Sequence, residues 1–322
     1  METVSAAVRK LRSSLAEIAM VGAVRGVFGL LRLLGPDRAS DLGGTVARAV
    51  GPLLSVHRVA LANIRAAFPD ADEARVREIA LGAWENLGRT GAEYAHLDTL
   101  FDYDYFAPKP DARTEVVGIE HFIALRDDGK PGIVFSAHLG NWELPAICAS
   151  RYGLDTTAIF RAPNDPAVAR AVHEVRSRTM GNLEAARQGA AFVMSNVLEK
   201  GGHLGMLIDQ HFTRGIAVPF FGRPALTNPI LGKFARRFDC PVHGVRVIRL
   251  PGHRFRLELT PPLDLPRDAE GHVDPAGAMA AMTAVVEGWV REYPEQWLWM
   301  HRRWRTPATA AVAAAPAPQP SP

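Results

Sequence analysis

The pattern of hydrophobic and polar positions divides the chain into a helical first hundred residues and a mixed remainder. Residues 14–35 are apolar except for Glu17, Arg25 and Arg32. A helix turns about 100° per residue, so Arg25 and Arg32 fall on one side, and apolar side chains cover the rest. This pattern suits a helix lying in the headgroup layer of a membrane with its arginines toward lipid phosphates, and it equally suits a core helix.

Two more helices are predicted before residue 100. The first covers residues 39–67 with an interruption at Gly51-Pro52, and the second covers residues 71–98. We therefore expect residues 1–100 to form a helical segment that associates with a membrane surface.

The middle of the chain alternates short apolar runs with amphipathic segments. Strands are predicted at 132–137, 156–160, 204–208, 242–250 and 254–260, and helices at 165–180, 189–200, 229–239 and 275–292. This alternation predicts an α/β fold over residues 101–305, with a central mixed, mostly parallel sheet flanked by helices. Residues 306–322 are rich in Ala and Pro and are expected to form a disordered tail.

Composition and charge exclude several classes of protein. With 48% hydrophobic and 22% charged residues in 322, the chain is not intrinsically disordered. Two distant cysteines, Cys148 and Cys240, exclude a disulfide scaffold. No apolar run approaches the length that a multi-span membrane protein needs. The eleven histidines show no HExxH or paired spacing, so no metal site is expected.

The charge is concentrated at the start of the chain. Residues 1–66 hold nine basic and four acidic side chains, whereas the whole chain has a net charge of only +3. A basic segment favours an anionic partner, either a membrane or a nucleic acid. We expect the membrane, because no DNA-reading motif and no basic groove with stacking aromatics is present.

Candidate chemistry lies directly after the first apolar strand, in the segment from His138 to Glu143. Five residues apart on one helix, these two side chains would not face each other. They can meet if His138 lies in the strand–helix turn and Glu143 in the first helical turn. Gly140 permits such a turn, Asn141 is a suitable N-cap, and Pro145 fits the first turn.

A histidine at the end of such a strand is placed to take a proton from a substrate hydroxyl. A carboxylate on its other ring nitrogen, here expected to be Glu143, would fix the tautomer. Backbone N–H groups of residues 140–142 could stabilise an oxyanion. No GxSxG elbow is present, so the base would act on the acceptor directly. The alternative is a capping motif with a structurally satisfied histidine.

Three further residues are candidates for substrate contacts. Arg161 follows the strand at 156–160 and Asp209 the strand at 204–208, so both should lie at the same sheet edge as His138. Arg302, after the tryptophans at 297 and 299, could contact a phosphate or headgroup. Each also has an ordinary structural interpretation, as a surface arginine or, for Asp209, a turn or helix cap. Residues 216–222 could line an acyl groove or form a core loop.

At these residues the chain resembles the bacterial lipid A late acyltransferases of the lysophospholipid-acyltransferase-like superfamily. The matching segments are Asn63-Ile-Arg-Ala-Ala-Phe-Pro69, His138-Leu-Gly-Asn-Trp-Glu143, Phe160-Arg161-Ala-Pro-Asn164, Ile208-Asp209-Gln210, Val218-Pro-Phe-Phe-Gly222 and Pro294-Glu-Gln-Trp-Leu-Trp-Met-His-Arg-Arg303.

The resemblance implies transfer of a fatty acyl group from an acyl thioester, usually on acyl carrier protein, to a hydroxyl of a lipid A precursor. It implies a peripheral or monotopic protein at the cytoplasmic face of the inner membrane, with the thioester as co-substrate and no cofactor. His138 would be the base and Glu143 its partner. Asn141, Arg161, Asp209 and Arg302 would contact substrate.

Two departures bear on the substrate. The segment Leu226-Thr-Asn-Pro-Ile230 replaces the family's usual Thr-Ser/Thr-Gly, and His211 stands where an acid is common. Acyl-CoA-dependent acylation of a phosphatidylinositol mannoside or another membrane glycolipid therefore remains an alternative. A lipid-binding scaffold without catalysis is a third, against which the His138/Glu143 pair argues.

Overall fold

The structure is a computed structural model and describes residues 22, 26–161, 166–187 and 189–305. Residues 26–34 are helical, while residues 14–21 and 23–25 of the segment predicted as a membrane-surface helix, and the predicted tail at 306–322, lie outside the described residues. Among the described residues, no helix is long and apolar enough to cross a membrane.

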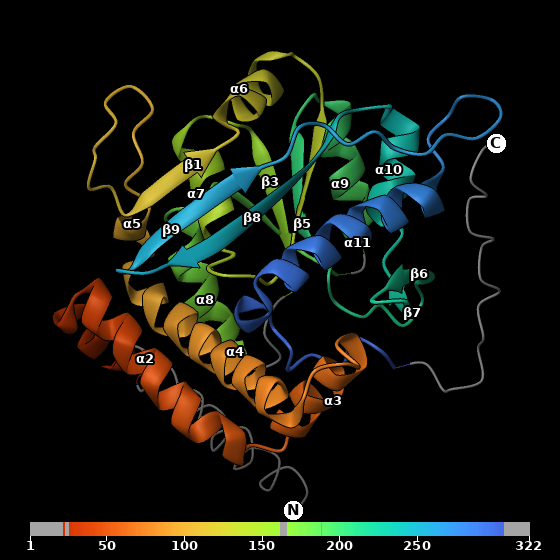
Figure 1. Cartoon of the computed structure of the whole chain (residues 1–322). Helices are drawn as coiled ribbons and strands as arrows, with labels where there is room; N and C mark the ends of the chain where they lie inside the picture. The colour runs from red at the N-terminus through yellow and green to blue at the C-terminus, as the bar shows by residue number, and fades with distance from the viewer. Residues whose placement is uncertain (1–21, 23–25, 162–165, 188, 306–322) are drawn as a thin grey trace, which may run out of the picture.

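A mixed β-sheet forms the centre of the described chain (Figure 1). Its strands are β1 (Thr114–Val117), β2 (Gly132–Ser136), β3 (Thr156–Phe160), β4 (Asn182–Ala185), β5 (His203–Leu207), β8 (Val242–Leu250) and β9 (Arg254–Leu259). The order across the sheet is β1-β9-β8-β2-β5-β3-β4, and among these strands only the β8–β9 pair is antiparallel. The predicted fold class is therefore confirmed for the core.

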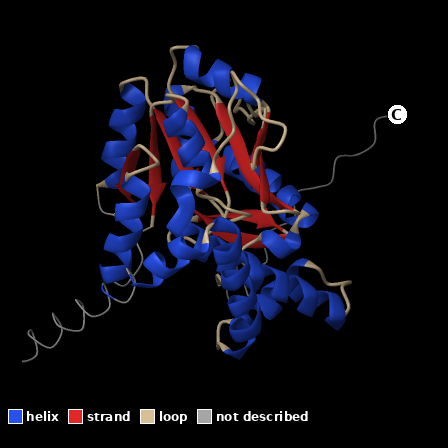
Figure 2. Cartoon of the chain, turned by 90° about the vertical axis from the view of Figure 1, so that its left-hand side faces the viewer, coloured by secondary structure: helices blue, strands red, loops and turns tan. Residues whose placement is uncertain are grey.

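Helices cover both faces of this sheet (Figure 2). They are α2 (Pro36–Val50), α3 (His57–Ala67), α4 (Glu73–Glu93), α5 (Leu97–Leu100), α6 (Ile119–Asp127), α7 (Leu144–Arg151), α8 (Pro166–Ser177), α9 (Ala190–Glu199), α10 (Ile230–Phe238) and α11 (Pro275–Glu292). Short 3₁₀ turns occupy Gly51–Leu53, Tyr94–His96 and Pro294–Gln296, and a small hairpin joins β6 (Ile216–Phe220) to β7 (Arg223–Thr227).

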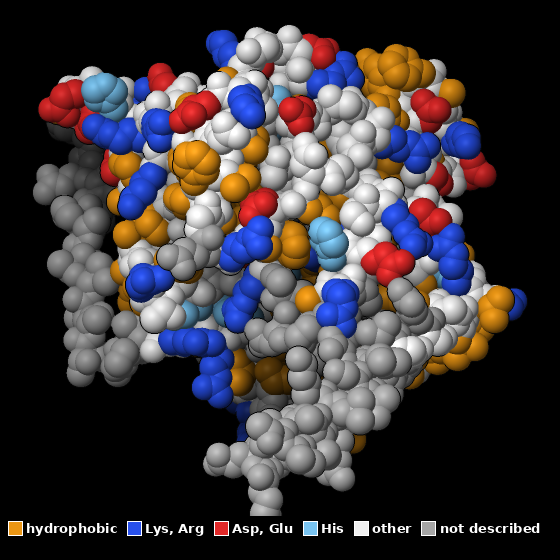
Figure 3. Space-filling view, turned by 180° about the vertical axis from the view of Figure 1, so that it is seen from behind, with side chains coloured by type: hydrophobic (Ala, Val, Ile, Leu, Met, Phe, Trp, Pro, Cys, Tyr) orange, Lys and Arg blue, Asp and Glu red, His pale blue; other side chains and the backbone are white. Residues whose placement is uncertain are grey.

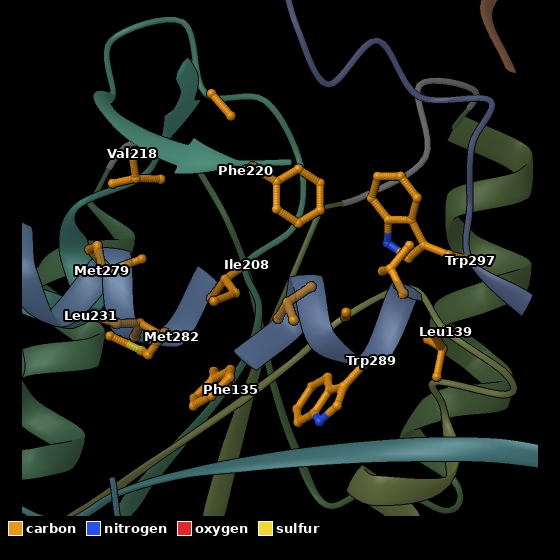
Figure 4. Packing of buried hydrophobic residues seen from close by; sticks show 14 of the residues in the cluster. Phe135, Leu139, Ile208, Val218, Phe220, Leu231, Met279, Met282, Trp289 and Trp297 are labelled. Carbon is orange, nitrogen blue, oxygen red and sulfur yellow. The ribbon is translucent and has the colours of Figure 1, made fainter. Parts of the chain in front are cut away.

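One face of the sheet packs against α11 through large apolar side chains (Figure 4). The ring of Phe135 on β2 stacks on Trp289 of α11, with centroids 5.8 Å apart. Gly244 on β8 permits this approach, since a Cβ there would come within 3.0 Å of both rings. Burial of these side chains supplies the main driving force for joining helix and sheet.

The hairpin of β6 and β7 also belongs to this core. Val218 and Phe220 are buried, and the Phe220 ring lies 5.7 Å from that of Trp297. The interpretation of residues 216–222 as a core segment is therefore confirmed, and they line neither of the two cavities described below.

The N-terminal helices form a separate layer in which α2 and α4 lie side by side (Figure 1). Their backbones approach at Gly43 and Gly88, where an added Cβ on either would come within 2.4 Å of the other's carbonyl oxygen. Only glycine allows this approach, so the two helices are fixed against each other. Because α4 also contacts the segment after β2, this layer supports the candidate site.

The sequence located most elements within a few residues. The predictions for 242–250 and 275–292 coincide with β8 and α11, and the interruption at Gly51-Pro52 separates α2 from α3. Strands β1 and β4 were missed because each is only four residues long. In α7 the N-cap is Glu143, not Asn141 as predicted, while Pro145 does lie in the first turn.

Candidate active site

His138 lies just beyond the carboxyl end of β2, where the prediction placed it. Its ring Nδ1 is 2.7 Å from Oδ1 of Asp209, and its backbone N–H donates to Oδ2 of the same carboxylate at 2.7 Å. With Nδ1 donating to the acid, Nε2 carries the lone pair, and the side-chain nitrogen of Gln210 lies 3.3 Å from it. The unprotonated Nε2, which faces the Gln210 amide, makes His138 chemically suited to act as a base.

Asp209 is buried directly after β5, and its interactions favour the ionised form. Burial alone would raise its pKa, but the adjacent His138 and the hydrogen bonds from His138 and Trp297 lower that pKa to about 2. The indole Nε1 of Trp297 donates to Oδ2 at 2.7 Å. The carboxylate is therefore charged at neutral pH and fixes both the tautomer and the orientation of the imidazole.

The predicted pairing of His138 with Glu143 is wrong. The carboxyl group of Glu143 instead accepts hydrogen bonds from the Tyr94 hydroxyl and from Arg176, whose Nε lies 2.9 Å away. The physical reason is the turn itself, which directs Glu143 toward the 3₁₀ turn after α4 and toward α8 while leaving the imidazole beside Asp209. Burial alone would lower the pKa of Arg176, but the interactions with Glu143 and Tyr94 outweigh burial and raise that pKa overall. The guanidinium therefore stays charged.

The turn between His138 and α7 is held by the backbone and by α4. Gly140 has φ of +58°, and a Cβ there would meet the carbonyl oxygen of Val247 at 2.1 Å. Its carbonyl accepts from Asn86 at 3.0 Å and Thr90 at 3.1 Å. Its N–H donates to the carbonyl of Gln296 at 3.1 Å. The prediction that this N–H stabilises an oxyanion is therefore wrong.

Asn141, expected to touch substrate, is instead fully buried and part of this support. Its side-chain nitrogen donates to Glu93 of α4 at 2.8 Å. Glu93 is ion-paired with Arg249 of β8 at 2.5 Å and accepts from Ser40 of α2 at 2.6 Å. Burial would raise the Glu93 pKa, but Arg249 and these hydrogen bonds lower it overall. Asn141 is therefore a positioning residue, linked to three elements.

An open cavity of about 790 Å³ lies in front of His138. Arg161, at the end of β3, lines it together with His138, as the strand-end argument predicted. Gln210, Arg214 and His301 line it as well, so polar and cationic groups stand among the apolar side chains of its wall. Burial is the main cause that lowers the pKa of His301 to about 4, so this ring is neutral and accepts the backbone N–H of His211 at 2.7 Å.

A second, mostly apolar cavity of about 110 Å³ lies between the sheet and α7. Val134, Ala158 and Gly205 contribute to its sheet side, and Ala146 and Ala149 to its helix side. The two cavities share walls formed by Ile159, Phe160, Arg176, Met206 and Leu207. Trp142 lines the apolar cavity and lies against the His138 ring, with centroids 5.2 Å apart.

Arg302 lies outside both of these cavities and instead lines a separate pocket with Arg58. Its neighbour Arg303 is fully buried and bonds to Thr227 and the carbonyl of Leu226, so it holds the hairpin of β6 and β7. Sequence reasoning grouped these arginines because adjacent residues in a loop give no periodicity that separates an exposed side chain from a buried one.

The sequence analysis missed Arg176, Trp142 and Gln210. Trp142 stood inside the candidate segment and Gln210 beside Asp209, so proximity in sequence was a usable signal for both. Arg176 lies in the middle of an amphipathic helix with other arginines, and nothing in the sequence distinguished it.

Comparison with known proteins identifies the family of this chain. The family described as bacterial lipid A biosynthesis acyltransferase matches residues 8–306, which is most of the chain. The chain belongs to the bacterial lipid A biosynthesis acyltransferase family. It is also 26% identical over 204 residues to a lipid A biosynthesis acyltransferase of Haemophilus influenzae, a match covering 60% of each chain. Within the family match lie both the His138–Asp209 pair and the two adjoining cavities.

Proposed function

We propose that this protein transfers a fatty acyl group from an acyl thioester to a hydroxyl of a lipid A precursor. The observation that carries the proposal is the His138–Asp209 pair, with the imidazole lining a large cavity that shares walls with an apolar one. Family membership supports the same reaction class.

In this mechanism Nε2 of His138 takes the proton of the acceptor hydroxyl as the oxygen forms a bond to the thioester carbon. The carbon–sulfur bond then breaks, and the imidazolium returns the proton to the departing thiolate. Asp209 stabilises the imidazolium through the short Nδ1 contact. Protons and charge balance without a covalent intermediate on the protein, and no cofactor is required.

The two cavities suit the two substrates. The apolar cavity, with Val134, Ala158 and Gly205 in its wall, would hold the acyl chain. The larger cationic cavity, with Arg161 and Arg214, would hold phosphate groups of the glycolipid or of the donor. Trp142, beside His138, would then lie where the chain enters.

The identity of donor and acceptor has a specific alternative. His211, and Asn228 of the segment that departs from the family's usual residues, both line the larger cavity. Because these side chains can change which substrate binds, two comparisons of kcat/KM are informative. The donors to compare are acyl carrier protein and acyl-CoA, and the acceptors are a lipid A precursor and phosphatidylinositol mannoside. We expect the lipid A precursor with acyl carrier protein to give the highest kcat/KM.

Membrane association at the cytoplasmic face is part of the proposal. The outer surface of α2 and the turn after it exposes large apolar side chains, and so does the helix at 26–34. They are Val27, Leu30, Leu33, Leu42, Val46, Val50, Leu53 and Leu54. Hydrophobic atoms gather along the lower right edge of Figure 3, where the N-terminal helices lie. A contiguous exposed apolar surface of this kind is typical of a binding surface.

The test is acyl transfer by purified wild-type protein and by His138→Ala. The variant should lose roughly 10²–10⁴-fold in kcat, because a general base contributes about that much. Lys130→Ala, which changes a residue of the loop before β2, serves as control. Near-normal turnover by the His138 variant would contradict the proposed function.

A further inference from the structure

A third pocket, of about 460 Å³, lies between α3 and the segment at residues 300–304. Arg58 and Arg302 line it from opposite segments, with Ser55 and Trp304. Among the described residues, it shares only Met300 with the cavity of His138, so we treat the two as different sites.

The pocket is cationic and its charges are uncompensated within the described part of the chain. Arg58 and Arg302 are exposed, and neither forms an ion pair or hydrogen bond with another described residue. Its lining, as far as the chain is described, contains no acidic side chain. The indole N–H of Trp304 is buried and also lacks a described partner. Two guanidinium groups without a described acidic partner are suited to a phosphate group.

Apolar side chains adjoin this cationic pocket. Leu53 and Leu54, which immediately precede Ser55 in the chain, are 83% and 48% exposed. They continue the exposed apolar stripe of Val46 and Val50 on α2. Exposed leucines next to unpaired arginines match the layering of a membrane interface, where acyl chains lie beneath headgroup phosphates. A soluble anion would give no reason for the leucines.

The pocket is also firmly connected to the active site. The side-chain nitrogen of Asn63 on α3 donates to the carbonyls of Trp299 at 2.9 Å and His301 at 2.7 Å. His301 itself lines the cavity of His138. A lipid bound between Arg58 and Arg302 would therefore hold the cavity at a fixed position relative to the membrane.

We propose that this pocket binds the phosphate of an anionic membrane lipid while Leu53 and Leu54 enter the apolar layer. The inference rests on the proposed function, since it specifies how the enzyme docks where its glycolipid substrate resides. Its ligand is a headgroup distinct from the acceptor, because the pocket and the His138 cavity have different linings.

The experiment measures binding of the full chain to vesicles of phosphatidylcholine alone and of phosphatidylcholine mixed with phosphatidylglycerol. The test variant is Arg58→Gln/Arg302→Gln. The matched control, Lys109→Gln/Lys130→Gln, removes the same charge from loops outside the pocket. Wild type and control should bind the anionic vesicles more tightly, and the test variant should lose roughly 10- to 30-fold in affinity for them.

Each other outcome has a defined meaning. If the arginine variant binds anionic vesicles as the control does, the pocket is not a lipid site, while the proposed acyl transfer is untouched. If wild type binds neither vesicle, the membrane association itself is wrong. If inorganic phosphate binds wild type but not the arginine variant and leaves vesicle binding unchanged, the pocket belongs to a free phosphate and the inference fails.

Discussion

Asp209 holds His138 at two points, because one carboxylate oxygen lies 2.7 Å from the ring Nδ1 and the other 2.7 Å from the backbone nitrogen. One side chain thereby fixes the imidazole and the chain that carries it. Glu143, five residues after the histidine, has a different partner in Arg176. The two acids should therefore respond differently to substitution.

Asp209→Asn should lower kcat by roughly 10³–10⁴-fold, comparable to loss of the aspartate in a catalytic triad, because the amide no longer fixes the tautomer. Glu143→Gln leaves the contact between His138 and Asp209 intact. The loss in kcat that it causes should therefore be at least about tenfold smaller than that of Asp209→Asn. Both are measured by steady-state kinetics at neutral pH. A larger loss of kcat for the Glu143 variant than for the Asp209 variant would mean that Asp209 is not the acid that supports His138 in catalysis.

The apolar cavity should set the acyl chain length. Ala158→Leu adds three carbons to its wall and should favour donors shorter by two or three carbons, changing the kcat/KM ratio by roughly 15- to 60-fold, since each methylene contributes about 0.8 kcal/mol. The measurement is competition between donors of different length. Unchanged activity with the shortest donor is the internal control, and an unaltered preference would place the chain elsewhere.

The buried ion pair of Glu93 and Arg249 should matter for stability as well as for the turn at Asn141. Glu93→Gln leaves a buried guanidinium without its counter-ion and should lower the free energy of unfolding by roughly 3 kcal/mol. The double variant Glu93→Leu/Arg249→Met should be less destabilised than Glu93→Gln. The free energies of unfolding are measured by urea denaturation. If the effects of the Glu93 and Arg249 substitutions simply add in the double variant, the two side chains are not energetically coupled.

Stability should also depend on pH through His301. Because burial lowers its pKa in the folded protein to about 4 while the unfolded chain keeps the ordinary value of 6.5, the unfolded state binds more protons between these values. Stability from this group is therefore complete above pH 6.5 and is lost as the pH falls toward 4, by on the order of 1 kcal/mol.

His301→Gln keeps an acceptor for the His211 N–H but cannot titrate. Its unfolding free energy should fall less steeply between pH 6.5 and 4 than that of wild type. Parallel pH profiles for the two proteins would show that His301 does not contribute.

The sequence by itself determined the α/β class, most of the strands and the sheet edge at which His138, Arg161 and Asp209 lie. It did so because a buried strand needs a run of apolar residues, and parallel strands place their carboxyl ends at one edge. These are local properties, which can be predicted from a few adjacent residues. The segment from His138 to Glu143 could be identified for the same reason.

Only the tertiary structure decided which acid meets the imidazole. His138 and Asp209 are 71 residues apart and come together because β2 pairs with β5 in parallel. Arg176 reaches Glu143, and Glu93 reaches Asn141, through packing of helices that the chain connects only at a distance. A side chain's partner depends on where other elements fold, so spacing along the chain alone gave Glu143 the role that Asp209 occupies.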